Sequence, residues 1–226
     1  MDNADSSSSP SSSSSTFNPN RVATKPTLTY FPTGGRAKVA RLLLEDAGVD
    51  YDYVPLYEEP GLTLVQSGAI ARHLGKKLGY AGASDHEAAL IDAAYEGVSD
   101  IVNRFVAVLG LPAEQAKTET ERLMKEYLPL QLGYLDKLLE KNGNNGFLVG
   151  GQLSYADAAL FTMLQSAFRR PGADSLAAQF PALKAYHDGI QSRDRIKRFL
   201  ATDPYGTSAP APSSASTSSS DVKEKN

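Results

Sequence analysis

The chain has 226 residues, 41% of them hydrophobic and 22% charged, which is enough to bury one or two cores and predicts a soluble globular protein. Its net charge of −3 offers no basic field for nucleic acid, and no apolar run approaches the roughly 20 residues of a membrane-spanning helix. The absence of cysteine excludes disulfides and cysteine nucleophiles, and with only three histidines a metal centre is not expected. Any thiol chemistry therefore has to use a thiol from another molecule.

The two ends of the chain, 1–24 and 204–226, are of low complexity. Serine occupies all but one of positions 6–15, and the other end is built mainly from Ser, Ala, Pro and Thr. Such segments bury too little apolar surface to offset their chain entropy, so we expect both to be disordered. The N-terminal end has no apolar core of a secretory signal. Its serine content fits a transit peptide, but its aspartates and the lack of arginine before Arg21 favour a cytoplasmic protein.

Residues 25–81 predict a small α/β domain. Apolar runs suited to strands alternate with amphipathic segments suited to helices, and glycine and proline lie between them. The expected elements in chain order are a strand at 27–31, a helix at 36–47 ended by Gly48, strands at 51–57 and 62–65, and a helix that begins at Ser67.

Residues 82–203 predict an all-helical domain. Ser84 and Glu87 have the spacing of a capping box, and the apolar face that follows continues for about seven turns. Ser154 and Asp157 repeat the same capping pattern. Further helices are expected at about 113–141, 154–169, 181–192 and 194–200.

Three motifs, "LTYFPTGGRAKVARLLLEDAGVDYDYV", "LTLVQSGAIARHLG" and "FLVGGQLSYADAALF", occur in this order. Together they resemble the cytosolic glutathione transferases of the tyrosine type, nearest the sigma-like branch, over nearly all of 25–200. The resemblance implies a thioredoxin-like N-terminal domain followed by an all-α bundle. It also implies glutathione as co-substrate without a metal, and a detoxifying conjugation of its thiolate to small apolar electrophiles, or a glutathione-dependent isomerisation.

The resemblance makes Tyr30 the catalytic residue, whose hydroxyl donates a hydrogen bond to the sulfur of glutathione. Lowering a thiol pKa of about 8.5 by two units requires roughly 2.7 kcal/mol, and a charge-assisted hydrogen bond of about 1.5 to 3 kcal/mol is of that size. Arg36 matches an arginine that polarises the site. From the residues alone, Tyr30 reads equally as an aromatic at the end of a strand, and Arg36 as a solvated first-turn arginine.

Gln66 and Ser67 match the pair that holds the γ-glutamyl end of glutathione. Ser67 is expected to be the N-cap of its helix, where free backbone N–H groups suit a carboxylate, although a cap needs no ligand. Asp100 matches an acidic residue that reaches the glutamyl amine bound by the partner subunit. A single aspartate on a helix is otherwise simply solvated.

One segment departs from the family pattern. Only four residues, 58–61, separate the run "YDYVPLY" from "LTLV", where the family has a helix, a strand and a loop that ends in a cis-proline. Four residues span at most about 14 Å, whereas a seven-residue strand is about 23 Å long. Either part of "YDYVPLY" serves as the return path, or "LTLV" pairs in the reverse direction. Pro60-Gly61 is read as a turn and not as a substitute for the cis-proline.

Two functions of different classes follow. The first is a glutathione transferase or isomerase with an apolar cleft near Val102, Phe105 and Val106. The second is an impaired or non-enzymatic relative, or the product of a shortened transcript or gene model. In either case the long apolar face that begins at Ser84 predicts a homodimer through the helical domain and the edge of the small domain.

Overall fold

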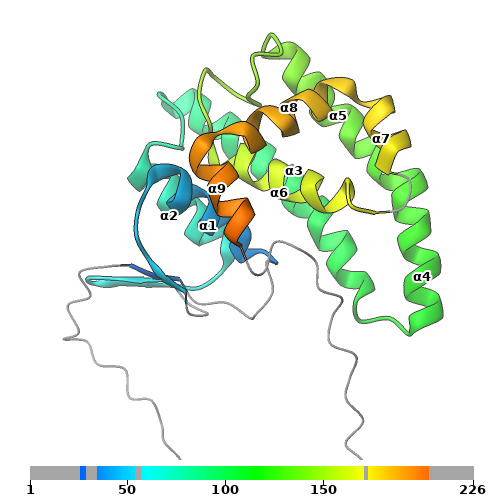
Figure 1. The fold of residues 1–226 in the computed structure, drawn as a ribbon, viewed down its shortest axis with the longest axis horizontal. Coiled ribbons are helices and arrows are strands. Elements are labelled where there is room, and N and C mark those ends of the chain that lie inside the picture. The colour runs from blue at the N-terminus through cyan, green and yellow to red at the C-terminus, as the bar shows by residue number, and fades with distance from the viewer. Residues whose placement is uncertain (1–25, 29–34, 54–56, 171–172, 204–226) are drawn as a thin grey trace, which may run out of the picture.

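The computed structural model describes residues 26–28, 35–53, 57–170 and 173–203. Both low-complexity ends, predicted to be disordered, lie outside the described residues, as does Tyr30. The described part forms a small domain of strands and two helices that packs against a larger group of helices (Figure 1). Among these residues no helix combines the length and apolarity needed to cross a bilayer.

The small domain contains a four-stranded sheet of order β2-β1-β3-β4. β1 pairs with β2 in parallel and with β3 in antiparallel, and β3 pairs with β4 in antiparallel, so β1, β2 and β4 run in one direction. The elements are β1 (Thr27–Leu28), α1 (Ala37–Ala47), β2 (Asp52–Tyr53), β3 (Tyr57–Glu59), β4 (Leu62–Leu64) and α2 (Ser67–Leu78). The predicted α/β domain is confirmed.

The strand that leads the chain back along the sheet begins with the last residue of "YDYVPLY". This residue, Tyr57, begins β3, and β3 runs back along β1 before the turn at Pro60-Gly61 leads into β4. Gly61 has φ of 76°, which a residue without a Cβ adopts at no steric cost. The first of the two predicted alternatives is therefore correct, and the strand that the sequence analysis took to be missing is present. Only residues 54–56 separate β2 from β3, fewer than the 3.6 residues of one helical turn.

Helix α1 is the centre of the small domain. All of Ala37 to Leu44 is buried, including the cationic side chains of Lys38 and Arg41. The helix ends at Gly48, as predicted, with φ of 70° and a hydrogen bond from Val49 N to Leu44 O of 2.9 Å. Because a helix of this kind buries every face, it needs partners on all sides.

The helical domain supplies those partners. Figure 1 shows α3 and α6 crossing at its centre and α9 lying against α1. The elements are α3 (Asp85–Val108), α4 (Ala113–Arg122), a π-helical turn (Leu123–Tyr127), α5 (Leu128–Lys141), α6 (Tyr155–Ala167), α7 (Ala173–Gln179), α8 (Pro181–Ser192) and α9 (Asp194–Thr202). All the helices predicted after residue 82 are found, and α7 is the one that was not predicted.

The N-cap hydrogen bond forms at both predicted sites, but the complete capping box forms only at Ser154. Ser84 Oγ accepts from Glu87 N at 3.2 Å, on the surface, and the Glu87 carboxylate accepts from Ala83 N at 2.7 Å. At the start of α6 the capping box is complete and buried. Asp157, which is 0% exposed, accepts from Leu148 N and Ser154 N at 2.8 Å each, from Ser154 Oγ at 2.6 Å and from Tyr186 Oη at 3.1 Å.

These two caps give a matched stability test. Asp157→Ala leaves several buried donors without an acceptor, so the free energy of unfolding should fall by about 3 kcal/mol or more in a urea titration. Ser84→Ala removes one exposed bond and should cost only about 1 kcal/mol. Equal losses in the two variants would show that burial of the Asp157 network does not matter to stability.

Candidate functional site

A cavity of about 680 Å³ lies where the small domain meets the helical domain. Its wall combines residues at the starts of α1 and α2 with residues of α3 and α6. Four of the polar residues in the wall are Arg36, Ser67, Ser99 and Gln165, and the apolar ones include Val102, Phe105, Val106 and Leu109. The cavity is therefore polar near the small domain and apolar along α3, and the three residues predicted to form an apolar cleft all line it.

Arg36 directly precedes α1 and reaches across to the helical domain. Its Nη2 donates to Asn103 Oδ1 on α3 at 2.6 Å. The side chain also lines the cavity, so it is not simply a solvated arginine of a first turn. This contact joins the first helix of the small domain to the apolar side of the cavity.

Gln66 and Ser67 form the start of α2. Gln66 carries φ of 73° and ψ of 115°, a conformation that strains a residue with a Cβ. The first helical bond runs from Ile70 N to Gln66 O at 3.0 Å, so Gln66 is the N-cap and Ser67 the first helical residue. The prediction that Ser67 is the N-cap was therefore wrong. A serine side chain favours the N-cap position, but the helix begins one residue earlier than that preference suggests.

Tyr95 on α3 is a cavity residue that was not predicted as part of a site, because it lies within the apolar helix face that begins at Ser84. Its ring is buried and lines the cavity, as does Ser67. Burial raises the pKa of Tyr95, while the charge of Arg72 and the Ser67 side chain act in the opposite direction. A hydroxyl in an otherwise apolar stripe is the signal that would have marked it.

The start of α2 is held against α3 by several contacts around Tyr95. The guanidinium of Arg72 lies 5.2 Å from the centre of the Tyr95 ring and forms an ion pair of 2.6 Å with Asp92. At Gly68, an added Cβ would lie 3.0 Å from Arg72 Nη1 and 3.5 Å from the Tyr95 ring. A small residue at this position lets the two helices approach closely where Ser67 faces the cavity.

The remaining predicted site residues are placed differently. Asp100 is exposed on α3 and is not among the residues that line the cavity. Tyr30 lies outside the described residues, so its role stays a prediction. The structure thus brings Arg36 and Ser67 to one cavity, with Gln66 immediately beside Ser67, and leaves Asp100 away from it.

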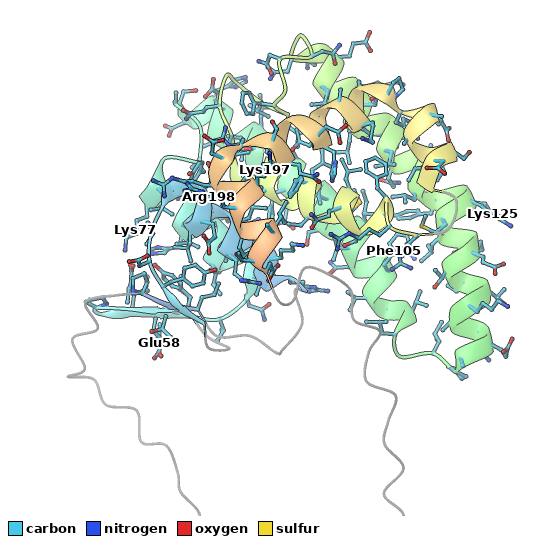
Figure 2. The ribbon with its side chains drawn as sticks, viewed as in Figure 1. Glu58, Lys77, Phe105, Lys125, Lys197 and Arg198 are labelled. Atoms are coloured by element: carbon cyan, nitrogen blue, oxygen red, sulfur yellow. The ribbon has the colours of Figure 1, made fainter. Side chains whose placement is uncertain are left out.

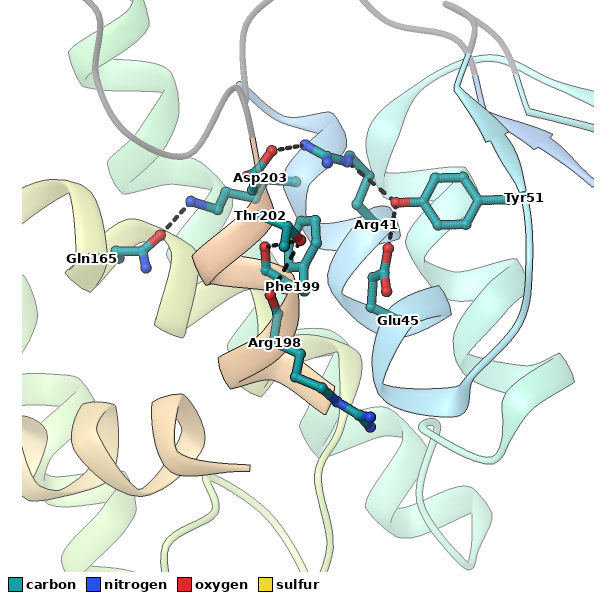
Figure 3. Close-up of polar contacts among 9 residues, drawn as sticks. Arg41, Glu45, Tyr51, Gln165, Arg198, Phe199, Thr202 and Asp203 are labelled. Carbon is teal, nitrogen blue, oxygen red and sulfur yellow. Dashed lines mark hydrogen bonds and ion pairs between the residues drawn. The ribbon is translucent and has the colours of Figure 1, made fainter. Parts of the chain in front are cut away.

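A second polar cluster lies under the cavity, between α1, α6 and the residue after α9 (Figure 3). Lys38 Nζ donates to Gln165 Oε1, and Arg41 Nη1 forms an ion pair of 2.7 Å with Asp203 Oδ1. Arg41 also donates to Tyr51 Oη at 3.3 Å and lies over the Phe199 ring at 4.6 Å. Burial lowers the pKa of Lys38 to about 8, although the Asp203 carboxylate acts to raise it.

The backbone strain at Gln66 predicts that a glycine at this position is no less stable than an alanine, the reverse of the usual order. Glycine is normally less stable than alanine by about 0.5 to 1 kcal/mol because its unfolded chain is freer, but strain of about 1 to 3 kcal/mol is relieved when no Cβ is present. We therefore expect the Gln66→Gly variant to be at least as stable as the Gln66→Ala variant in urea unfolding. An alanine variant clearly more stable than the glycine variant would show that position 66 is unstrained.

Comparison with known proteins agrees with this architecture. Residues 99–203 match the family model described as glutathione S-transferase, C-terminal domain. The chain is 34% identical to glutathione S-transferase P of Bos taurus in an alignment of 198 residues, and the match covers 78% of this chain and 91% of that protein. Two solved structures are similar: that of NaGST-2 has a TM-score of 0.73 at 28% identity, covering 80% of this chain and 97% of that one. The pi-class glutathione S-transferase of Onchocerca volvulus has a TM-score of 0.70 at 30% identity, covering 78% and 92%.

The extent of these matches decides the family. The bovine relative is matched over nearly its whole length, across both the sheet and the helical domain, and the two solved structures share the same arrangement. The relatives are named as glutathione S-transferases, which are enzymes of the transferase class. The chain therefore belongs to the glutathione S-transferase family.

Proposed function

We propose that this protein conjugates the thiolate of glutathione to small apolar electrophiles, or uses glutathione to isomerise them. The observation that carries the proposal is the single cavity of about 680 Å³ whose wall contains both Arg36 and Ser67 and the apolar residues Val102, Phe105 and Val106. A peptide thiol and an apolar electrophile bound in such a cavity would be held side by side, which makes their reaction effectively unimolecular.

The chemical roles follow from the groups at the polar end. Tyr30 is proposed to donate a hydrogen bond to the sulfur, and Arg36 to favour the thiolate through its charge. Gln66 and Ser67 are proposed to hold the γ-glutamyl end at the start of α2, where N–H groups lack helical partners. Asp100 is proposed to act only across a dimer, in keeping with its place outside the cavity.

The second candidate function is that of an impaired or non-enzymatic relative of the family. The short link between β2 and β3 favours it. Only three residues, 54–56, connect these strands, where the family has a helix. The sequence analysis took the family's cis-proline to be lost. Pro55, two residues before β3, is a candidate for this proline that the sequence analysis did not consider. Pro55 lies outside the described residues, so its part in glutathione binding belongs to this proposal.

Membership of the family also supports proposals about the co-substrate, the cellular location and the role. We propose glutathione as the co-substrate, a cytoplasmic location and a role in detoxification. The domain limits 25–81 and 82–203 remain those of the sequence analysis. The tyrosine-type, sigma-like assignment rests on the quoted motifs, whereas a similar solved structure is titled pi-class.

The transferase proposal is tested with Tyr30→Phe, which keeps the ring and removes the hydroxyl. Loss of a hydrogen bond of about 1.5 to 3 kcal/mol predicts conjugation about tenfold to hundredfold slower at neutral pH, with a higher apparent pKa of the bound thiol. The melting temperature should barely change. Wild-type protein that is not retained on glutathione-agarose and reacts no faster than free glutathione would favour the impaired relative instead. A lower melting temperature without a kinetic effect would assign the hydroxyl to folding.

We also propose a homodimer in which a second copy covers the groove between α3 and α5. This groove has a volume of about 460 Å³ and contains Leu90 and Tyr134, which are 45% and 57% exposed. On the small domain, Val65, just after β4, is a further apolar residue that is 64% exposed. An apolar patch of this kind is unusual on a monomer.

Sedimentation equilibrium at micromolar concentration should therefore give twice the mass of the chain. Tyr134→Glu puts a charge into the groove and should shift the equilibrium to monomer. Lys125→Glu changes an exposed residue of the π-helical turn that precedes α5 (Figure 2), and it should leave the dimer unchanged. A wild-type monomer under these conditions would contradict the proposed dimer.

A further inference from the structure

The loop between α5 and α6 contains two Asn-Gly pairs, Asn142-Gly143 and Asn145-Gly146. In such a pair the backbone nitrogen of the glycine attacks the side-chain carbonyl carbon of the asparagine, because no Cβ of the following residue hinders the approach. The reaction gives a cyclic succinimide and releases ammonia. Water then opens the ring to aspartate or isoaspartate. Each pair is therefore a place where the chain is modified without an enzyme, at a rate that the surrounding structure controls.

The contacts of Asn142 protect its amide. Its Nδ2 donates to Phe147 O at 2.9 Å and to Gly150 O at 2.8 Å, and the residue is half-buried. The nitrogen of Gly143, which would have to attack, donates to Glu140 O at 2.9 Å in the turn that ends α5. The leaving amino group and the attacking nitrogen are thus both held in the unreacted arrangement. Deamidation would also place a carboxylate opposite two carbonyl oxygens, where no hydrogen bond can form.

The contacts of Asn145 act on the other end of its amide. Its Oδ1 accepts from Phe147 N and from Asn142 Nδ2, at 3.1 Å each, while its Nδ2 donates to Gly150 O at 2.8 Å. A backbone N–H only donates and a backbone carbonyl only accepts, so these partners fix which end of the amide is the oxygen. Asn145 is exposed. A Cβ added at Gly146 would meet nothing within 4 Å beyond the two adjoining residues, which leaves room for this nitrogen to move.

The two arrangements have opposite effects on the reaction. Attack on the side-chain carbon pushes negative charge onto Oδ1, so donors already aimed at that oxygen stabilise the transition state more than the reactant. Asn145 has two such donors. The hydrogen bonds listed for Asn142 instead hold its amino group and the glycine nitrogen, and they must be broken before the reaction can proceed. The fold should therefore accelerate deamidation at one pair and slow it at the other.

We propose that the folded chain promotes deamidation of its own Asn145 and protects Asn142, so that Asn145 is a modification site that records the age of each molecule. In the first step the bond from Gly146 N to Cγ of Asn145 forms and the bond from Cγ to Nδ2 breaks. The proton lost by Gly146 N leaves with the amino group as ammonia. Water supplies the atoms for ring opening, so no oxidant or reductant is needed. The inference goes beyond the proposed function and needs no glutathione.

The two products should differ in stability. An aspartate at position 145 keeps oxygens that accept from Phe147 N and Asn142 Nδ2, and loses only the donation to Gly150 O. An isoaspartate routes the main chain through the former side chain and lengthens the loop by one methylene. This change falls just before Leu148, whose N–H donates to the buried carboxylate of Asp157 at 2.8 Å. We therefore expect the isoaspartate form to be the less stable of the two.

The main test compares folded wild type with wild type in guanidinium chloride, both incubated at neutral pH. Fragmentation of the peptide that follows Lys141 measures deamidation at both pairs by mass spectrometry, and a sample taken at the start corrects for the digestion. Asn145 should react at least about tenfold faster in the folded chain, since one donor to a developing oxyanion accounts for a factor of about 10² or more in enzymes. Asn142 should react more slowly when folded. Equal rates at Asn145 in the two states would overturn the proposal, as would faster reaction of Asn142 than of Asn145 in the folded protein.

A matched pair of variants tests the donor from Asn142. Asn142→Leu has a similar size without an N–H group and should slow deamidation of Asn145 severalfold. Asn144→Gly removes a neighbouring exposed side chain and suits the φ of 51° at that position, so the rate should match that of the wild type. Equal rates in wild type and a folded Asn142→Leu variant would contradict stabilisation by this donor. If Asn142→Leu does not fold in a urea titration, the comparison of folded and unfolded wild type decides alone.

The stability of the products is measured on aged protein. Isoaspartate is identified by methylation with an isoaspartyl methyltransferase, and anion exchange separates the modified chains by their added negative charge. The isoaspartate fraction should unfold at a lower urea concentration than Asn145→Asp, which carries the same charge on a normal main chain. Equal urea midpoints for the two would show that the loop tolerates the longer main chain and would overturn the expected loss of stability.

Discussion

Helix α1 is buried on every side, and much of the remaining structure serves to cover it. Leu42, Leu43 and Leu44 are at most 1% exposed, and its other buried apolar residues are at most 8% exposed. A helix of 11 residues could not be this deeply buried by a small sheet and one neighbouring helix, so α6 and α9 of the helical domain complete its surroundings (Figure 1). The cavity then lies at the N-terminal end of α1, where the coverage from the two domains meets.

The same burial accounts for the electrostatics beneath the cavity. Lys38 and Arg41 occupy helix positions that face the helical domain, so their charges have to be accommodated inside the protein. Asp203 does this for Arg41, aided by Tyr51, whereas Lys38 has the neutral Gln165 (Figure 3). A buried ion pair of this kind contributes little net stability compared with apolar packing, but losing one partner is costly. The cluster therefore fixes how α1 sits against α6 and α9 more than it adds to stability.

Most of the fold could be read from the sequence because its signals are local. The capping residues Ser84 and Ser154, the stop at Gly48 and the turn at Pro60-Gly61 each determine backbone geometry within a few residues. Helix α7 was not predicted because a helix of seven residues shows little periodicity. The strand β3 was misjudged as missing, since its three residues were counted with the end of a longer run and the link.

The site was less predictable because it depends on contacts between distant residues. Arg36 and Ser67 were identified through motifs, but their meeting in one cavity depends on α3, and Tyr95 was recognised only as an apolar face residue. No local pattern pairs Lys38 with Gln165, which is 127 residues away. The N-cap at Gln66 was missed for the opposite reason. Its strained backbone contradicts the local preference for serine at a cap, and strain of this kind is a property of the folded chain.

The ion pair between Arg41 and Asp203 has a consequence for synthesis. The two residues are 162 positions apart, so the partner of Arg41 is among the last residues of the described chain to be made. At roughly 5 to 20 residues per second, a ribosome needs about 8 to 30 s to pass from one to the other. Once α2 has been made, the small domain is complete in sequence but still lacks α9 and the carboxylate that covers Arg41. The N-terminal domain of this protein is therefore unable to reach its final packing before α9 and Asp203 have been made.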